Sequence, residues 1–195
     1  MAKVDEMKKI RDEVFALGGP LSEYRKANGY FPVLGEGSHD SKIMFIGEAP
    51  GRNEAKTGRP FCGAAGKILD ELLASVDIPR KEVYITNIVK DRPPENRDPL
   101  PSEIEAYGPF LDRQIATIQP KIIATLGRYS MDYIMRKMDL AFEIEPISAA
   151  HGKLYEAETS YGAIKILPLY HPAAAIYNRS LIDTLKKDFQ ALKNL

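Results

Sequence analysis

Four short runs of almost continuous apolar residues, separated by segments of helical character, constrain the fold of this chain more than any other feature. The apolar runs, each a predicted strand, cover residues 42–47, 82–89, 121–127 and 163–170. The predicted helices cover residues 3–17, 64–76, 101–120, 128–138 and 180–194. Strands that are apolar on both faces and alternate with helices are typical of a parallel sheet covered on both sides. We therefore expect an α/β fold, a single three-layer domain over residues 1–195 with a central four-stranded parallel sheet flanked by helices.

Two helix boundaries have recognisable signals. The N-terminal helix over residues 3–17 should stop at the Gly18-Gly19-Pro20 sequence, which breaks helical structure. The helix over residues 101–120 should begin with Ser102 as its N-cap, because Glu105 follows three residues later in the pattern of a capping box.

Composition narrows the class of protein. The 195 residues include 27 Lys and Arg and 27 Asp and Glu, so the net charge does not point to a nucleic-acid or membrane partner. The single cysteine, Cys62, excludes an internal disulfide and cannot by itself build a zinc site or an iron–sulfur cluster. Because we find neither a signal-peptide pattern nor a long apolar run, we expect a cytoplasmic, monomeric protein that does not enter a membrane.

Three polar segments rich in glycine and proline follow predicted strands. They read GEAPGRNEAKTGRPF after the first strand, NIVKDRPPENRDP at the end of the second and LYHPAAA at the end of the fourth. Ligands of open parallel sheets bind outside the carboxyl ends of the strands, so we expect these segments to meet there. None of them has the G-x-x-x-x-G-K-[ST] or GxGxxG pattern, which argues against a nucleotide-binding loop.

Single residues in these segments allow both functional and ordinary interpretations. Phe61 could stack on a ligand or cap the core, and Asn87 could pair with a pyrimidine edge or satisfy nearby backbone. His171 could donate to an anion that forms on a leaving group, although a histidine more often has a structural role. The basic residues Lys90, Arg92 and Arg97, spaced by prolines, suit phosphate contacts or a solvated face.

Taken together, the segments resemble a known family. GEAPGRNEAKTGRPFCGAAGKIL, NIVKDRPPENRDP and LPLYHPAAA are similar to the sequence blocks of the family 4 uracil-DNA glycosylases, from about Gly19 to the C-terminus. The resemblance implies removal of uracil from DNA, with the base flipped out of the stack into a closed pocket. It also implies a parallel four-stranded sheet, in agreement with the strand pattern.

The resemblance assigns roles to the candidate residues. Phe61 would stack on uracil, Asn87 would pair with its N3–H and O4 edge, and His171 would donate to O2 as the bond breaks. Glu48 would activate water modestly, and Glu54 is a second acidic candidate for catalysis. Two smaller residues, Gly47 and Ala49, complete the implied base-binding set; Ala49 stands where family 1 enzymes have an aspartate.

On the DNA side, Arg92 and Arg97 would grip phosphates. The AAAIYNR turn after His171, with Ala174, Ala175 and Arg179, would enter the minor groove to fill the space left by the base.

One departure from the family concerns a cofactor. Family 4 members resemble one another in carrying a [4Fe–4S] cluster on four cysteines, and flanking residues place those positions at Ala16, Gly19, Asp91 and Tyr107. We therefore expect no cluster, metal or other cofactor. We also expect Tyr30 and Phe31, together with Tyr107, to fill the vacated space by packing.

The sequence thus favours a monofunctional glycosylase for uracil-containing DNA, because no lysine stands in an obvious place for a Schiff base. Two alternatives remain open. One is a non-catalytic module that binds uracil or damaged DNA, and the other is a glycosylase for another deaminated base such as hypoxanthine.

Overall fold

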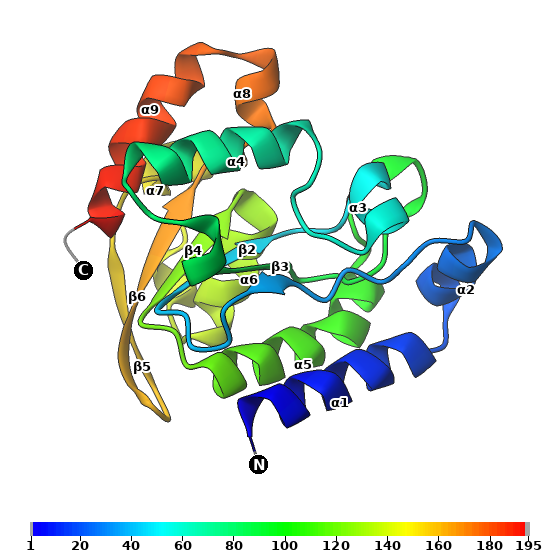
Figure 1. Cartoon of the computed structure of the whole chain (residues 1–195). Coiled ribbons are helices and arrows are strands. Elements are labelled where there is room, and N and C mark those ends of the chain that lie inside the picture. The colour runs from blue at the N-terminus through cyan, green and yellow to red at the C-terminus, as the bar shows by residue number, and fades with distance from the viewer. Residues whose placement is uncertain (1, 194–195) are drawn as a thin grey trace.

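A twisted sheet runs through the middle of the molecule, with helices above and below it (Figure 1). The computed structural model describes residues 2–193. Within this range the strands form one six-stranded sheet in the order β1-β3-β2-β4-β6-β5. Their bounds are β1 Glu36–Gly37, β2 Ile43–Gly47, β3 Tyr84–Asn87, β4 Ile122–Leu126, β5 Tyr155–Thr159 and β6 Gly162–Leu169.

The four central strands are parallel, and they are the four strands predicted from the apolar runs. β3, β2, β4 and β6 pair side by side, so their carboxyl ends lie at one edge of the sheet. The α/β fold and the parallel centre are therefore confirmed. Two antiparallel edge strands, β1 against β3 and β5 against β6, add to the expected sheet.

The longer helices agree with the sequence predictions to within two residues at most ends. Longer and shorter helices together are α1 Lys3–Ala16, α2 Pro20–Ala27, α3 Arg52–Thr57, α4 Ala64–Ser75, α5 Pro101–Ile118, α6 Arg128–Lys137, α7 Ile147–Ala150, α8 Ala174–Tyr177 and α9 Ser180–Phe189. Short 3-10 turns lie at Arg80–Glu82, Pro94–Asn96, Ala141–Glu143 and Gln190–Leu192. The last helix was predicted to reach residue 194, which lies outside the described residues, but α9 already ends at Phe189 and a 3-10 turn follows it.

The expected N-cap of α5 is wrong. The helix begins at Pro101, one residue before Ser102, and the residue that precedes it is Leu100. The backbone N–H of Leu100 donates to the Glu103 carboxylate at 2.8 Å. Proline is favoured in the first turn of a helix because its missing N–H would have no partner there, so the start moves to Pro101.

The strands alternate their side chains between two cores. Met44 and Ile46 of β2 pack with α1, α5 and α6, whereas Phe45 between them packs with α4 and α9. Figure 1 shows α1 and α5 side by side under the sheet and α4 with α9 above it. Burial on both faces is the reason that these strands are apolar throughout.

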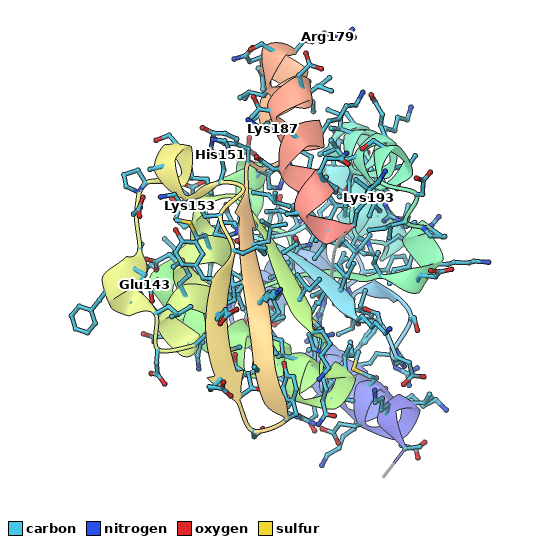
Figure 2. The ribbon with its side chains drawn as sticks, turned by 90° about the vertical axis from the view of Figure 1, so that its left-hand side faces the viewer. Glu143, His151, Lys153, Arg179, Lys187 and Lys193 are labelled. Atoms are coloured by element: carbon cyan, nitrogen blue, oxygen red, sulfur yellow. The ribbon has the colours of Figure 1, made fainter. Side chains whose placement is uncertain are left out.

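A polar contact joins the C-terminal helix α9 to the segment between α7 and β5. Figure 2 shows His151, just after α7, beside α9. Its Nδ1 atom lies 2.8 Å from the carboxylate of Asp188 on α9. Among the helices of residues 2–193, none combines the length and the apolar character that a membrane span requires.

Candidate functional site

A cavity of about 440 Å³ opens at the carboxyl ends of β2, β3 and β6. Its lining includes residues from all three polar segments: Glu48 and Phe61 from the first, Asn87 from the second and His171 from the third. Ala49 and Glu54 also line it. The convergence expected from the strand pattern is present, because parallel strands deliver their following loops to the same edge.

Gly47, the last residue of β2, allows this close assembly. A Cβ atom at this position would lie 2.3 Å from Oδ1 of Asn87 and 2.9 Å from the ring of Phe61. Both distances are shorter than van der Waals contact, so any larger residue would push the amide or the ring out of place. The register of β2 against β3 pairs Gly47 with Asn87 directly.

Phe61 forms an aromatic wall with His171. The two ring centroids are 5.6 Å apart and the planes are inclined by 29°. Phe61 has a φ of +47°, a left-handed conformation that is costly for a bulky residue and is found mainly where function requires it. A Cβ at Gly66 would lie 1.8 Å from the Phe61 carbonyl oxygen, so the start of α4 holds the backbone of this residue.

Asn87 is 2% exposed, yet its side-chain amide is not used inside the protein. Within residues 2–193, no group donates to or accepts from that amide, although Lys90 Nζ donates to the Asn87 backbone carbonyl at 2.6 Å. The amide atoms are not among the fully buried side-chain atoms without a partner in residues 2–193, so they are open to the cavity that Asn87 lines. An amide that faces a cavity with one acceptor and two donors unused is suited to bind a polar ligand edge.

His171 is held in one tautomer. The backbone N–H of Ala173 donates to Nδ1 of His171 at 3.1 Å, so the ring proton of the neutral imidazole is on Nε2. Burial lowers the pKa of His171 to about 4, and the nearby Glu54 carboxylate opposes that shift only partly. At neutral pH the side chain is therefore an uncharged donor.

Glu48 is a carboxylate of the cavity with a shifted pKa. Its pKa is raised to about 7, mainly by burial and then by the charge of Asp98, while Arg128 opposes the shift. Asp98 is itself held by the Tyr129 hydroxyl at 2.5 Å and by Arg128 at 3.6 Å. Glu48 therefore changes its charge close to physiological pH.

Glu54 lies at the same cavity but has another contact pattern. Its Oε1 atom accepts the backbone N–H groups of Cys62 and Gly63 at 3.0 and 2.9 Å. The carboxylate thus fixes the turn that directly follows Phe61. This geometry suits a positioning residue better than a second catalytic acid.

Comparison with known proteins agrees with this arrangement. Residues 34–194 match the uracil DNA glycosylase superfamily. A type-4 uracil-DNA glycosylase of Sulfurisphaera tokodaii is 46% identical over 193 residues, which are 98% of this chain and 86% of that protein. The chain belongs to the uracil-DNA glycosylase superfamily. A second type-4 enzyme, of Archaeoglobus fulgidus, is 45% identical and aligns with 84% of this chain and 81% of its own length. A third, of Saccharolobus solfataricus, is 48% identical over 83% of this chain and 74% of its own.

The arginines of this type-4 family member are less free than their sequence context indicates. Arg97 makes two hydrogen bonds to Glu103, at 2.8 and 2.6 Å, and also lines the cavity. Arg92 donates to Asn96 at 2.7 Å and lies over the ring of Tyr30. A DNA phosphate would therefore have to be bound by Arg92 and Arg97 while these side chains keep their partners within the protein, or it would have to replace those partners.

The turn after His171 contains both exposed and buried residues. Ala175 is 1% exposed and packs in the core, so its side chain does not reach the surface and is not available to DNA. Ala174 is half-buried. Figure 2 shows Arg179 at the outer end of α9, where its side chain extends away from the body of the protein.

Sequence reasoning missed two residues of this region. Tyr177 lines the cavity and is 91% exposed, which places an unshielded aromatic ring at its rim. Lys90, which the sequence groups with the phosphate-binding basic residues, is fully buried and donates to Thr86, Gln114 and the Asn87 carbonyl. A lysine in a polar segment gives no sequence signal of burial, whereas Tyr177 could have been found as the aromatic residue of the AAAIYNR turn.

Proposed function

We propose that the cavity binds a uracil base flipped out of DNA and that the protein hydrolyses its N-glycosidic bond, leaving an abasic site. One observation carries this proposal: the nearly buried amide of Asn87 has no partner within residues 2–193 and borders a cavity walled by the rings of Phe61 and His171. Membership of the superfamily supports the same reaction.

The amide selects the base by its hydrogen-bond pattern. Oδ1 of Asn87 accepts the N3–H of uracil while Nδ2 donates to O4. Cytosine has an acceptor at N3 and donors at N4, so an amide in this orientation would face acceptor with acceptor and donor with donor. Phe61 contributes a flat apolar surface for the base, and Gly47 and Ala49 leave room for it.

Bond cleavage leaves charge that the protein must stabilise. The bond between C1′ of the sugar and N1 of uracil breaks, and its electron pair leaves with the base. Nε2–H of His171 donates to O2, where part of the negative charge develops. Because the imidazole is neutral, it stabilises the uracil anion by a hydrogen bond without giving up its proton.

Water completes the reaction at C1′. The water oxygen bonds to the cationic sugar carbon, and one water proton passes to the Glu48 carboxylate and then to solvent. Ala49 offers no second carboxylate at this point, so the assistance from Glu48 is modest. We assign Glu54 the supporting task of fixing the turn that carries Phe61.

DNA would approach the open side of the cavity. Arg92, Arg97 and Arg179 supply positive charge for phosphates, and the turn that contains Ala174 and Tyr177 faces the gap left by the flipped base. A monomeric state, independence from a cofactor and a cytoplasmic location remain our predictions.

The test is release of uracil from a labelled oligonucleotide, followed by alkaline cleavage of abasic sites. We expect the wild-type protein to produce strand scission in the uracil-containing oligonucleotide. The control variant Asn28→Asp should do the same, because the exposed side chain of Asn28 lies just after the C-terminal end of α2. We expect strongly reduced scission with Asn87→Asp and a smaller reduction with Glu48→Gln.

The same assay separates the alternatives. Retention of uracil-DNA without product, unaffected by Glu48→Gln, would mean a binding module. Faster release of hypoxanthine than of uracil would mean a different base. Either result would overturn the proposal.

A further inference from the structure

Three polar side chains form a closed cluster away from the cavity, at the junction of α1, α2 and α5. Arg25, Asp91 and Tyr107 are exposed by 4%, 0% and 3%. The Arg25 guanidinium lies 3.1 Å from the Asp91 carboxylate, and the Tyr107 hydroxyl donates to that carboxylate at 2.6 Å. A buried charge is tolerated only when it is paired and hydrogen-bonded, and here both conditions hold.

Arg25 also reaches the end of α1. Its two terminal nitrogens donate to the carbonyl oxygens of Val14 and Phe15, at 3.3 and 3.0 Å. These carbonyls belong to the last turn of the helix, which contains no basic residue of its own; the Val14 carbonyl also accepts the backbone N–H of Leu17 at 3.3 Å. One guanidinium therefore connects α1, α2 and, through Asp91, the segment after β3.

The cluster occupies the region where the family resemblance places four iron–sulfur ligands. Ala16 and Gly19 have no side chain that could bind iron, and Gly19 has a φ of +104° that a cysteine would rarely adopt. The Asp91 carboxylate already accepts hydrogen bonds from Arg25 and from the Tyr107 hydroxyl. Within residues 2–193, no three His, Cys, Asp or Glu side chains are grouped to hold a metal ion. The residues present do not fit the cluster.

The expectation that aromatic packing fills this space is wrong for Phe31, which is 51% exposed. Tyr30 packs beside the region, against Tyr24 and Arg92. Tyr107 does lie in the region, but it acts through its hydroxyl. A polar network fills the region because Arg25, which the sequence pattern did not single out, supplies the positive charge.

We propose that Arg25, Asp91 and Tyr107 form a buried ionic brace. The brace holds the segment after β3 against α1, α2 and α5, in the place where the family resemblance puts an iron–sulfur cluster. Asp91 begins the segment whose later residues Asn96, Arg97 and Asp98 line the cavity. The brace fixes the start of this segment to three helices, so its members are positioning residues for the DNA side of the site. Burial raises the pKa of Tyr107, which keeps its hydroxyl a donor.

The test compares Asp91→Asn, Tyr107→Phe and the double variant with Asp132→Asn. Asp132 pairs with Arg136 on the exposed face of α6 at 2.9 Å, so its replacement makes the same chemical change without burial. Thermal unfolding, hydrogen exchange over residues 90–98 and the KM for a uracil oligonucleotide are measured.

We expect Asp91→Asn to lower Tm by about 10 °C, because it leaves a buried guanidinium without its counter-charge. Tyr107→Phe should lower Tm by about 5 °C, because one hydrogen bond to a charged group is lost. The double variant should melt close to Asp91→Asn, since both changes remove parts of one network. Exchange over residues 90–98 should accelerate, and KM should rise several-fold more than kcat falls.

Equal Tm values for Asp91→Asn and Asp132→Asn would overturn the proposal, and so would unchanged exchange over residues 90–98. If Asp91→Asn does not fold, Tyr107→Phe decides by the same criteria. The unfolding and exchange measurements need no enzymatic activity, so they test the brace even if the reaction proposed above were wrong.

Discussion

A single amide carries base selectivity in this account. Asn87 ends β3 with its side chain at the cavity, beside Gly47 and Phe61, and no residue in the described part of the chain uses its hydrogen-bonding groups. Replacing the amide by a carboxylate keeps the shape but removes both donors. The consequence is therefore chemical and not steric.

We predict that Asn87→Asp lowers kcat/KM for uracil about 10- to 100-fold. The estimate follows from an unpaired O4 and the repulsion of its lone pairs, at about 1–3 kcal/mol for an unsatisfied buried group. The measurement is uracil release under single-turnover conditions, with Asn28→Asp as control. An undiminished rate in Asn87→Asp would contradict the assignment.

Glu48 should impose a pH dependence. Its pKa is raised to about 7, mainly by burial and then by Asp98, so the carboxylate is ionised above that pH and protonated below it. We predict that kcat/KM rises as pH increases through about 7 and that Glu48→Gln flattens the profile. Asp98→Asn should move the midpoint to lower pH because it removes a negative charge, whereas Asp132→Asn should not. A midpoint unmoved by Asp98→Asn would count against this electrostatic coupling.

Among the contacts between secondary-structure elements, the hydrogen bonds of buried Lys90 fix the end of β3 to α5. Its Nζ atom donates to Thr86, to Gln114 of α5 and to the Asn87 carbonyl, at distances of 2.6–2.8 Å. This contact joins α5 to the strand that carries the base-reading amide. Burial lowers the pKa of Lys90 to about 7, against about 10.4 for an unfolded chain.

That difference predicts how stability changes with pH. Between about pH 7 and 9 the unfolded chain binds a proton that the folded protein releases, so the free energy of unfolding should rise with pH by up to about 1.4 kcal/mol per unit. Lys90→Met should remove this rise. Urea unfolding at several pH values measures it, and equal slopes for the two proteins would contradict the buried, shifted lysine.

The turn around α8 should act on DNA and not on the base. We predict that Tyr177→Ala weakens binding of uracil-DNA about 10-fold, because an exposed ring at the cavity rim can stack in the space left by the flipped base. Phe142→Ala is the matched control, since Phe142 is fully exposed on another part of the surface. An equal loss of affinity for uracil-DNA in both variants would show that the Tyr177 ring does not contribute specifically to DNA binding.

For the whole molecule, the sequence predicts the parallel centre of the sheet and the meeting of Glu48, Phe61, Asn87 and His171, because buried parallel strands are apolar on both faces and send their loops to one edge. The edge strands escape prediction for physical reasons. β1 has only two residues, and β5 alternates buried and exposed side chains in the polar sequence YEAET.

The contacts that depend on distant partners are also invisible in the sequence. Arg25 and Asp91 are 66 residues apart, and neither local periodicity nor residue type reveals that they pair in the interior. Lys90 has the same difficulty, since a basic residue next to Arg92 looks like part of a phosphate-binding rim. Polar burial is decided by the tertiary structure, where each charge finds partners that compensate for lost water.

The most direct test of the central claim is a crystal structure of the protein with free uracil. We expect the base in the cavity at the ends of β2, β3 and β6, stacked on Phe61, with its N3 and O4 edge on the Asn87 amide and O2 toward Nε2 of His171. Uracil bound with another edge toward Asn87, or bound outside this cavity, would contradict it.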